Sequence, residues 1–468
     1  MSLPIVWRGE VDEATYEEAR VGRVFNHRRP NRYPVAVVNA SSINHVVQAV
    51  RLAKEKGFRV SVRSGGHSWA AWSVRDNAVL IDLGNLKHIS LNESKDLVSV
   101  SPSTTGSILN AFLSKRGLMF AGGHCPDVGL GGFLLQGGMG WNCRNWGWAC
   151  ERIRALDVVT ADGELIRVDT SQNSDLLGAA KGAGPGFPAV VVQYHLEVRP
   201  KVPVMRSSAF VYPISEYRKV MRWVVDITPT FDADTEIVAV GNTPPGINQK
   251  CIVALFVTFK DSEEECLAAL KPGNESRPEG FVVEDVNRPT SLAKEYCDQA
   301  GANPQGHRYC ADNGYVNNHE DVVEVLEPAF TTLPNGKAFA LWYAMAPCSR
   351  REMPDMALSM QSDHYFAIYT IWEHEKDDDR CQDWTEGVMK KIAPKCDGAY
   401  LGDSDFQVRQ TKYWTDQKAR KLMDIRRQRD PDDRICGYLD RKDQAGKAGL
   451  LNNNTWFGRR GDSPMEAV

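Results

Sequence analysis

The predicted fold is organised around Arg63-Ser64-Gly65-Gly66-His67-Ser68-Trp69. It follows a run of strand-forming residues, 58–62, and its two glycines let the backbone turn sharply and bring N–H groups close to an anion. The stretch therefore predicts a phosphate-binding loop that ends in a reactive imidazole, that of His67. A lone histidine in a loop is more often solvated or hydrogen-bonded, so this interpretation needs a second motif.

The second motif is Gly122-Gly123-His124-Cys125-Pro126-Asp127-Val128-Gly129-Leu130-Gly131-Gly132. It places one thiol among glycines, where only a backbone without Cβ atoms can approach a large flat ligand. A free cysteine is more often a small buried hydrophobic residue. Both motifs together, in this order and between helix and strand patterns, favour a functional interpretation of His67 and Cys125. The glycine series resumes at 137–141.

Two common nucleotide-binding loops are excluded by the spacing of the glycines. Neither 129–132 nor 182–186 completes G-x-G-x-x-G, and the chain contains no G-x-x-x-x-G-K-[ST]. A nucleotide must therefore be held in another way.

The motifs resemble the FAD-binding domain of the vanillyl-alcohol oxidase family, also called the PCMH-type family, and especially its berberine-bridge-enzyme-like branch. The resemblance is densest over 34–200 and returns at 398–401 and 430–432. In that branch one FAD is bonded to both a histidine and a cysteine, which implies that His67 is linked to the flavin 8α-methyl group and Cys125 to ring atom C6. The resemblance implies further cofactor contacts from Arg63, Ser64, Gly65, Gly66, Ser68, Val128, Gly129, Gly131, Gly132, Gly137 and Gly138.

Length and composition bound the class of protein. With 468 residues, 42% of them hydrophobic, the chain can bury two sizeable cores, which predicts two domains. The 56 basic and 60 acidic residues nearly balance, so neither a nucleic-acid surface nor a membrane partner is expected. The eleven cysteines show no CxxC pairing, so neither disulfides nor a metal site are predicted. The N-terminus lacks a signal-peptide pattern, which predicts an intracellular, cytoplasmic protein.

Helix and strand patterns alternate through the first part of the chain. Ser41 or Ser42 is expected to cap a helix that ends at Gly57, and Thr104 or Thr105 to begin another with Gly117 at its end. Further predictions are a helix over 10–20 and a hairpin formed by 156–160 and 164–168.

From about residue 202 the pattern changes to longer apolar strands between charged helices, as in 236–240, 252–259 and 366–372. This predicts an antiparallel sheet backed by helices. The acidic run 375–380 lacks the spacing of a calcium site and is expected to be a solvated loop.

The predicted fold class is α+β, with the two domains of the vanillyl-alcohol oxidase fold. We expect an FAD-binding domain of two small α/β subdomains at 1–200 and a substrate domain at 201–395. A return to the first domain follows at 396–440, with a helix at 414–425 ended by 430–432, and then a polar tail at 441–468.

The resemblance also implies the chemistry. A flavin accepts a hydride at N5 from a C–H bond while a base removes a proton. We expect an FAD-dependent oxidase that takes this hydride from an alcohol, either a sugar or a bulky secondary metabolite, and reduces O2 to H2O2. Val128 matches the small residue associated with oxygen access. The alternatives are a dehydrogenase with another electron acceptor, and a flavin-bound protein that binds ligands without turnover.

Tyr400 is the expected catalytic base, because sugar oxidases of this branch use a tyrosine of the matching region. Strand alternation would turn Asp403 away from Tyr400. The partner that activates the phenol must then come from elsewhere, with Tyr309, Asp312 and Glu373 as candidates. The alternative is a structural tyrosine on a buried strand.

Overall fold

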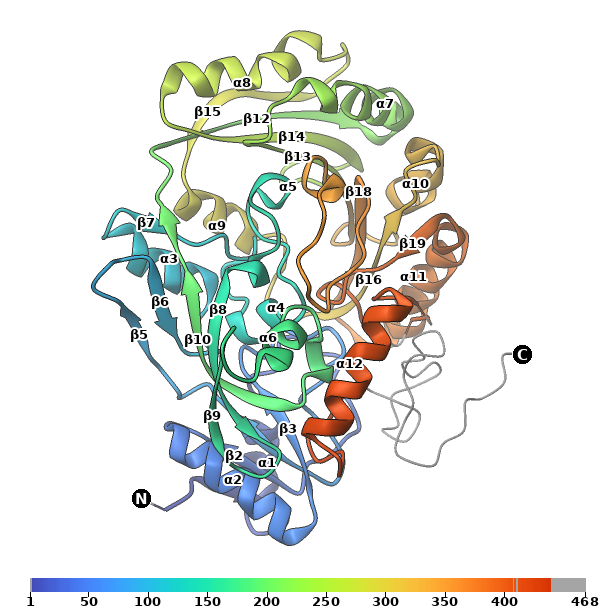
Figure 1. Ribbon diagram of the computed structural model, residues 1–468. Helices are drawn as coiled ribbons and strands as arrows, with labels where there is room; N and C mark the ends of the chain where they lie inside the picture. The colour runs from blue at the N-terminus through green and yellow to red at the C-terminus, as the bar shows by residue number, and fades with distance from the viewer. Residues whose placement is uncertain (1, 407, 410, 439–468) are drawn as a thin grey trace.

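The computed structural model describes residues 2–406, 408–409 and 411–438, and its α+β architecture confirms the predicted fold class (Figure 1). Within these residues the strands form sheets of four, five, two and eight strands. The predicted polar tail at 441–468 lies outside the described residues.

The first sheet has the order β1-β2-β4-β3, with β2, β4 and β3 parallel. Helix α2 (Ile43–Lys56) packs on it through Val46, Ala49 and Val50. Ser42 caps this helix and Gly57 ends it in the left-handed conformation, so the predicted helix is confirmed. The other elements are β1 (Ile5–Trp7), α1 (Glu13–Val21), β2 (Ala36–Asn39), β3 (Arg59–Arg63) and β4 (Ala78–Asp82).

The second sheet is antiparallel, in the order β5-β6-β10-β8-β9. Its β8–β9 pair is the predicted hairpin. Thr105 caps α3 (Gly106–Ser114), and Gly117 follows that helix with a positive φ of 70°. The strands are β5 (Ile89–Leu91), β6 (Leu97–Val100), β8 (Ile153–Thr160), β9 (Leu165–Val168) and β10 (Ala189–Glu197), while β7 (Leu118–Met119) pairs with β11 (Arg199–Pro200).

The eight-stranded sheet is antiparallel throughout, in the order β15-β12-β14-β13-β17-β18-β16-β19. Helices cover one of its faces, which confirms the predicted sheet backed by helices (Figure 1). The strands are β12 (Val204–Pro213), β13 (Thr235–Asn242), β14 (Cys251–Lys260), β15 (Val283–Thr290), β16 (Arg308–Val316), β17 (Phe339–Ala344), β18 (His364–Trp372) and β19 (Cys396–Gly398). The helices are α7 (Tyr217–Ile227), α8 (Glu263–Ser276), α10 (Val322–Thr331) and α11 (Asp378–Ile392).

The acidic run 375–380 is not the solvated loop that its composition predicted. It forms a 3-10 turn, Glu375–Asp377, and the first turn of α11. Carboxylates are favourable there because the helix dipole places partial positive charge at a helix N-terminus. Asp378 is also paired with Arg308 at 2.6 Å and accepts a hydrogen bond from the Trp372 indole.

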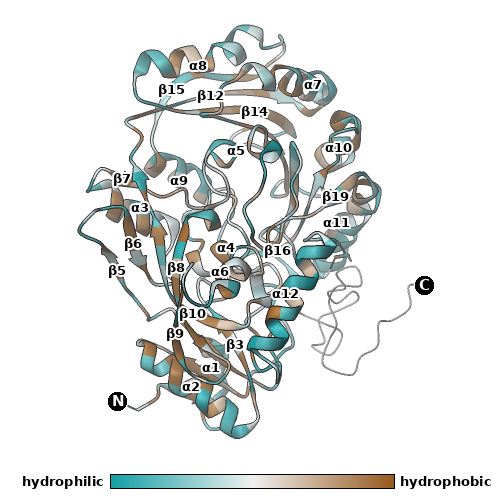
Figure 2. Ribbon diagram, viewed as in Figure 1, coloured by the Kyte–Doolittle hydropathy of each residue, from teal (hydrophilic) through white to brown (hydrophobic). Residues whose placement is uncertain are grey.

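The C-terminal helix α12 (Asp416–Arg429) returns to the first half of the chain and contacts α6 (Ser174–Ala180). Arg429 forms an ion pair with Asp175 at 2.6 Å. The helix ends before Asp430, as predicted, and the Asp430 carboxylate accepts two backbone N–H bonds. Figure 2 shows α12 as largely hydrophilic, which is expected of a helix that buries only one face.

Candidate functional site

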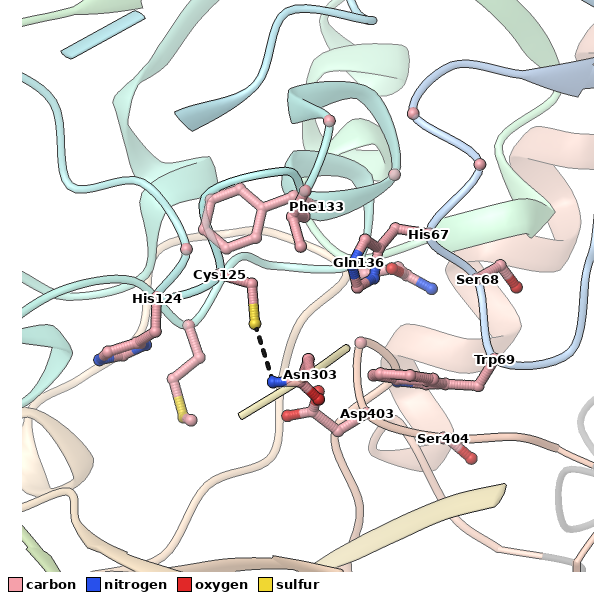
Figure 3. A pocket seen from close by; sticks show the side chains of 18 of the residues that line it. His67, Ser68, Trp69, His124, Cys125, Phe133, Gln136, Asn303, Asp403 and Ser404 are labelled. Atoms are coloured by element: carbon pink, nitrogen blue, oxygen red, sulfur yellow. Dashed lines mark hydrogen bonds between the residues drawn. The ribbon is translucent and has the colours of Figure 1, made fainter. Parts of the chain in front are cut away.

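One cavity of about 840 Å³ lies between the two predicted glycine loops and the uncovered face of the eight-stranded sheet. This volume is in the upper part of the usual range for small-molecule sites. His67 and Cys125 both point into it (Figure 3). The other predicted site residues on its lining are Arg63, Ser64, Gly65, Gly66, Ser68, Val128, Gly129, Gly131, Gly132 and Tyr400. The described lining does not include Gly137 or Gly138.

The two glycine loops pack against each other backbone to backbone. A Cβ atom on Gly129 would lie 2.7 Å from the Cα of Gly65, and one on Gly131 would lie 2.5 Å from the Ser64 hydroxyl. These glycines are therefore required by the contact between the loops, a role that the sequence did not reveal. Gly132 is different, because it is exposed to the cavity and its nearest neighbour would be 3.9 Å away.

Several contacts hold the His67 ring. Its Nε2 lies 3.2 Å from a carboxylate oxygen of Asp127, and the ring stacks on Phe25 with centroids 3.8 Å apart. The Trp69 ring meets it edge-on. Burial opposes ionisation of Asp127, but the His67 contact and hydrogen bonds from Gln305 and a backbone N–H together lower the pKa of that carboxyl. The imidazole is therefore fixed at the cavity wall.

The Cys125 thiol accepts a hydrogen bond from the Asn303 side-chain amide at 3.3 Å. Burial raises the pKa of this thiol to about 12, and the Asn303 donor opposes that shift. Asn303 follows helix α9 (Leu292–Ala300), so the thiol is contacted from a segment far away in the sequence (Figure 3).

The Arg63 side chain is buried and binds other groups of the protein. Its guanidinium forms a buried ion pair with Asp82 at 2.6 Å and donates to the main-chain carbonyls of Ala19 and Arg20. Burial lowers the pKa of Arg63, while Asp82 opposes the shift. The guanidinium thus ties the first glycine loop to β4.

An acid and base pair that the sequence did not reveal lies on the cavity wall, with Glu236 buried and His124 half-buried. The Nε2 atom of His124 lies 2.9 Å from a carboxylate oxygen of Glu236. The other oxygen of Glu236 accepts bonds from the Asn142 backbone N–H at 2.6 Å and the Tyr343 hydroxyl at 3.0 Å. Burial alone would lower the pKa of His124, but Glu236 raises it. His124 belongs to the second motif, whereas Glu236 lies on a distant strand without any signal in the sequence.

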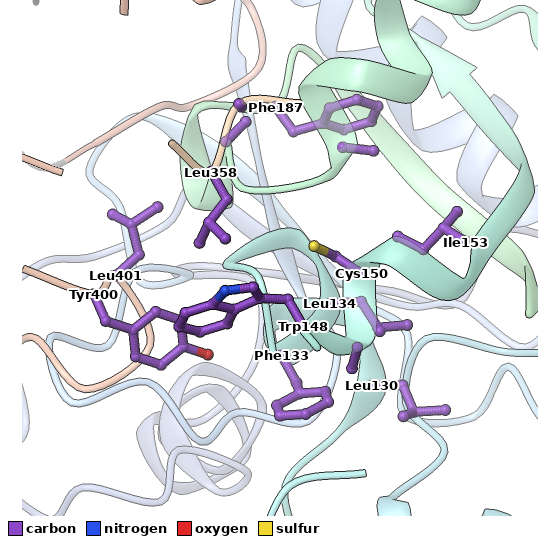
Figure 4. Packing of buried hydrophobic residues seen from close by; sticks show 14 of the residues in the cluster. Leu130, Phe133, Leu134, Trp148, Cys150, Ile153, Phe187, Leu358, Tyr400 and Leu401 are labelled. Carbon is purple, nitrogen blue, oxygen red and sulfur yellow. The ribbon is translucent and has the colours of Figure 1, made fainter. Parts of the chain in front are cut away.

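Tyr400 is buried with its ring beside Trp148, and its hydroxyl accepts the N–H groups of Gly138 and Met139, each at 3.1 Å (Figure 4). Burial raises its pKa well above the usual value, although the two N–H donors oppose the shift. Gly138, which is not on the described lining, therefore holds the Tyr400 hydroxyl through its backbone N–H.

The strand predicted around Tyr400 is wrong, because β19 ends at Gly398. The backbone after it curves back against the tyrosine ring, since a Cβ atom on Gly402 would be 2.5 Å from that ring. Asp403 consequently lines the same cavity instead of pointing away.

The three candidate partners of Tyr400 are engaged elsewhere. Tyr309 donates its hydroxyl proton to the Pro304 carbonyl at 2.6 Å. Asp312 is paired with Arg409 at 2.8 Å, and Glu373 with Lys337 at 3.0 Å. None of these contacts reaches the Tyr400 phenol.

The sheet contributes a largely apolar wall to the cavity. Residues opposite each other on neighbouring antiparallel strands share one face of a sheet. One such row of cavity-lining residues is Val253, Val240 and Leu341, and the next is Leu255, Val238 and Tyr343. Phe339 continues the wall.

Comparison with known proteins identifies the family. A family described as FAD binding domain matches residues 34–169. The FAD-linked oxidoreductase nodO of Hypoxylon pulicicidum is 39% identical over 439 residues, which cover 94% of this chain and 98% of that protein. This chain is an FAD-linked oxidoreductase of the PCMH-type family. The oxidoreductase is also 37% identical to janO of Penicillium janthinellum over 93% of this chain and 98% of janO.

Two solved structures share the fold of the oxidoreductase. BBE-like 1 of Physcomitrella patens superposes with a TM-score of 0.78 at 19% identity, covering 92% of this chain and 95% of that one. The xylooligosaccharide oxidase of Myceliophthora thermophila, in complex with xylobiose, gives a TM-score of 0.77 at 19% identity, with 96% and 98% covered.

The residues at the cavity fit FAD. Gly132 leaves open space in a wall of backbone, and a thiol and an imidazole face the same volume. Among the described residues no group of three or more His, Cys, Asp or Glu side chains could hold a metal ion, and none of the eleven cysteines, all of which are described, forms a disulfide. In that part of the chain, no helix combines the length and apolar character needed to cross a bilayer.

Proposed function

We propose that FAD is attached through both His67 and Cys125. The observation that carries this proposal is that loops from two separate motifs pack glycine to glycine and turn an imidazole and a thiol into one cavity. Gly65, Gly129 and Gly131 would set the loop geometry, while Gly132 would leave room for the cofactor. The bound FAD supplies an acceptor for a hydride and then returns the electrons to an oxidant.

A denaturing gel viewed for flavin fluorescence tests the attachment. We expect the flavin to stay with the wild-type chain and with each of His67→Ala and Cys125→Ala, because either residue leaves one bond. Loss of all flavin from the wild type under denaturing conditions would contradict the double attachment.

We further propose that the oxidoreductase is an oxidase, with O2 as oxidant and H2O2 as product. We also propose that residues 1–200 form the cofactor domain and 201–395 the substrate domain, and that 396–440 return to the cofactor domain. The separate sheets support this division, although β19 at the start of the return still pairs with β16. Val128 on the cavity lining supports access of oxygen.

For the substrate we propose a bulky, mostly apolar alcohol and not a sugar. The two rows of valine, leucine and tyrosine on β13, β14 and β17 offer much apolar surface and few donors. The fused-ring alcohol naphthalen-2-ylmethanol serves as a probe, with cellobiose for comparison. We expect anaerobic bleaching of the flavin by the first and not by the second.

The same experiment distinguishes an oxidase from a dehydrogenase and from a protein that binds ligands without turnover. Readmission of air should restore the flavin absorbance of an oxidase and release one peroxide for each flavin, whereas a dehydrogenase would stay bleached until another acceptor is added. A protein that binds ligands without turnover would show a spectral shift but no bleaching.

A further inference from the structure

Asp403 is a half-buried carboxylate on the lining of the cavity, on the opposite side from the glycine loops. Figure 3 shows it projecting into the space that Cys125 and Asn303 also face. Its charge acts on Cys125 and is in turn influenced by His67 and His124. A molecule held between the two anchoring residues and the sheet would therefore meet this carboxylate.

Two phenols hold Asp403. The Tyr365 hydroxyl donates to its Oδ2 atom at 2.5 Å, and Tyr369 also forms a side-chain hydrogen bond with it. These tyrosines are four residues apart on β18, so both stand on the same face of the strand. The carboxylate is thus oriented by neutral donors, which leave it able to accept a proton.

Two other carboxylates on the lining, Glu236 and Glu295, are more deeply buried and are held differently. Glu295 accepts a hydrogen bond from the Thr290 hydroxyl and lies 3.5 Å from the Arg288 guanidinium. Glu236 uses one oxygen for the imidazole of His124 and the other for a backbone N–H and the Tyr343 hydroxyl. These contacts fix Glu236 as an acceptor that positions His124. The Tyr400 hydroxyl is likewise occupied, because it accepts two backbone N–H groups.

We infer that Asp403 is the general base of the reaction. This inference rests on the proposed oxidation of an alcohol, and it replaces Tyr400 in that role. The Asp403 carboxylate accepts the proton of the substrate hydroxyl, and the electron pair of the broken O–H bond becomes the second bond of a carbonyl. The C–H bond breaks at the same carbon, and its electron pair leaves with the hydrogen as a hydride for FAD. The substrate loses two electrons and FAD gains two.

Burial raises the pKa of Asp403, and the two phenol donors oppose that shift. A base works only when deprotonated, so the rate of flavin reduction should rise with pH through this raised pKa and level off above it. Other titratable groups also influence Asp403, so variants must establish which group causes this rise of the rate with pH (the pH limb). These groups are Tyr315, Tyr365, Tyr369, Tyr400, Cys125, His67 and His124.

The test is anaerobic rapid mixing of the FAD-loaded enzyme with naphthalen-2-ylmethanol over a range of pH. Asp403→Asn should slow flavin reduction by about 10²- to 10⁴-fold, the usual contribution of a general base, and abolish the pH limb. Its flavin content, and the reoxidation by O2 of flavin reduced with dithionite, should stay as in the wild type. Asp397→Asn is the matched control, because Asp397 is an exposed carboxylate bonded to Asn317.

Tyr365→Phe tests whether Asp403 titrates as the base, because a purely structural role of Asp403 would not make the pH limb shift in this variant. Losing a donor to the carboxylate raises the Asp403 pKa further, so the limb should shift to higher pH while the plateau rate is largely kept. Infrared pH-difference spectra of the holoenzyme without substrate should show a protonated carboxyl band that is absent in Asp403→Asn.

Wild-type reduction rates in Asp403→Asn, or persistence of the limb and the infrared band in that variant, would overturn the inference. Failure of the proposed function looks different, because no alcohol would then bleach even the wild-type flavin. In that case the infrared band still decides whether Asp403 titrates in the cavity.

Discussion

The two walls of the cavity are built on opposite principles. The loop wall is made of backbone, and its critical contacts join glycines, such as Gly65 and Gly129, that tolerate no added atom. The sheet wall is made of alternating side chains on separate strands, such as Val240 and Leu341, which meet only through strand pairing. One wall is a fixed holder for a cofactor, and the other is a surface whose chemistry can change without changing the fold.

The largest effect is expected from changing the two residues proposed to anchor the flavin, His67 and Cys125. The double variant His67→Ala, Cys125→Ala should release all its flavin when denatured, whereas each single variant keeps one bond. Absorbance of the filtrate after acid precipitation measures the released fraction. Covalent flavin in the double variant would contradict the proposed attachment, because a residue other than His67 and Cys125 would then be the anchor.

The next effect concerns the contact between the loops. Gly129→Ala should reduce flavin loading strongly, because its Cβ would meet the Gly65 backbone at 2.7 Å and the loops would have to separate. Gly387→Ala on α11 is the matched control, since its Cβ would have no neighbour within 4 Å and the residue is not on the described cavity lining. We expect its flavin loading to match the wild type. Equal loading of both variants would show that the loops can move apart freely.

On the sheet wall we expect a smaller and more selective effect. Leu341→Asp puts a charge where an apolar ligand packs, and should weaken binding of naphthalen-2-ylmethanol by about 10- to 100-fold, the equivalent of about 1.5–3 kcal/mol for one buried leucine side chain. Flavin content should not change. Leu267→Asp, at a position 44% exposed on α8, is the control. Loss of flavin from Leu341→Asp would mean that the walls are not independent.

The smallest effect is expected at Tyr400. Tyr400→Phe removes the acceptor of two backbone N–H groups and should cost about 1–3 kcal/mol of stability, measured by denaturant unfolding. The pH limb of flavin reduction should remain, because it belongs to Asp403. If instead the rate of reduction collapsed and the limb disappeared, Tyr400 would be the base, as the sequence predicted.

The class of fold and the family could be predicted from the sequence alone, and the two residues proposed to anchor the flavin were also chosen there. The reason is physical: the loop wall is built from short contiguous segments, and glycines, one imidazole and one thiol can be recognised within them. Helix caps at Ser42 and Thr105 were predictable for the same reason, since a cap depends on residues three positions apart.

The arrangement of the carboxylates around the cavity could be seen only in the tertiary structure. Glu236 meets His124, and Asp403 meets Tyr365, across distances in the sequence that no local pattern encodes. The strand alternation assumed around Tyr400 failed because β19 ends at Gly398 and the chain then turns back against the tyrosine ring. Which carboxylates face the cavity therefore depends on how eight strands and two loops are assembled, and the spacing of residues in a single sequence does not specify that.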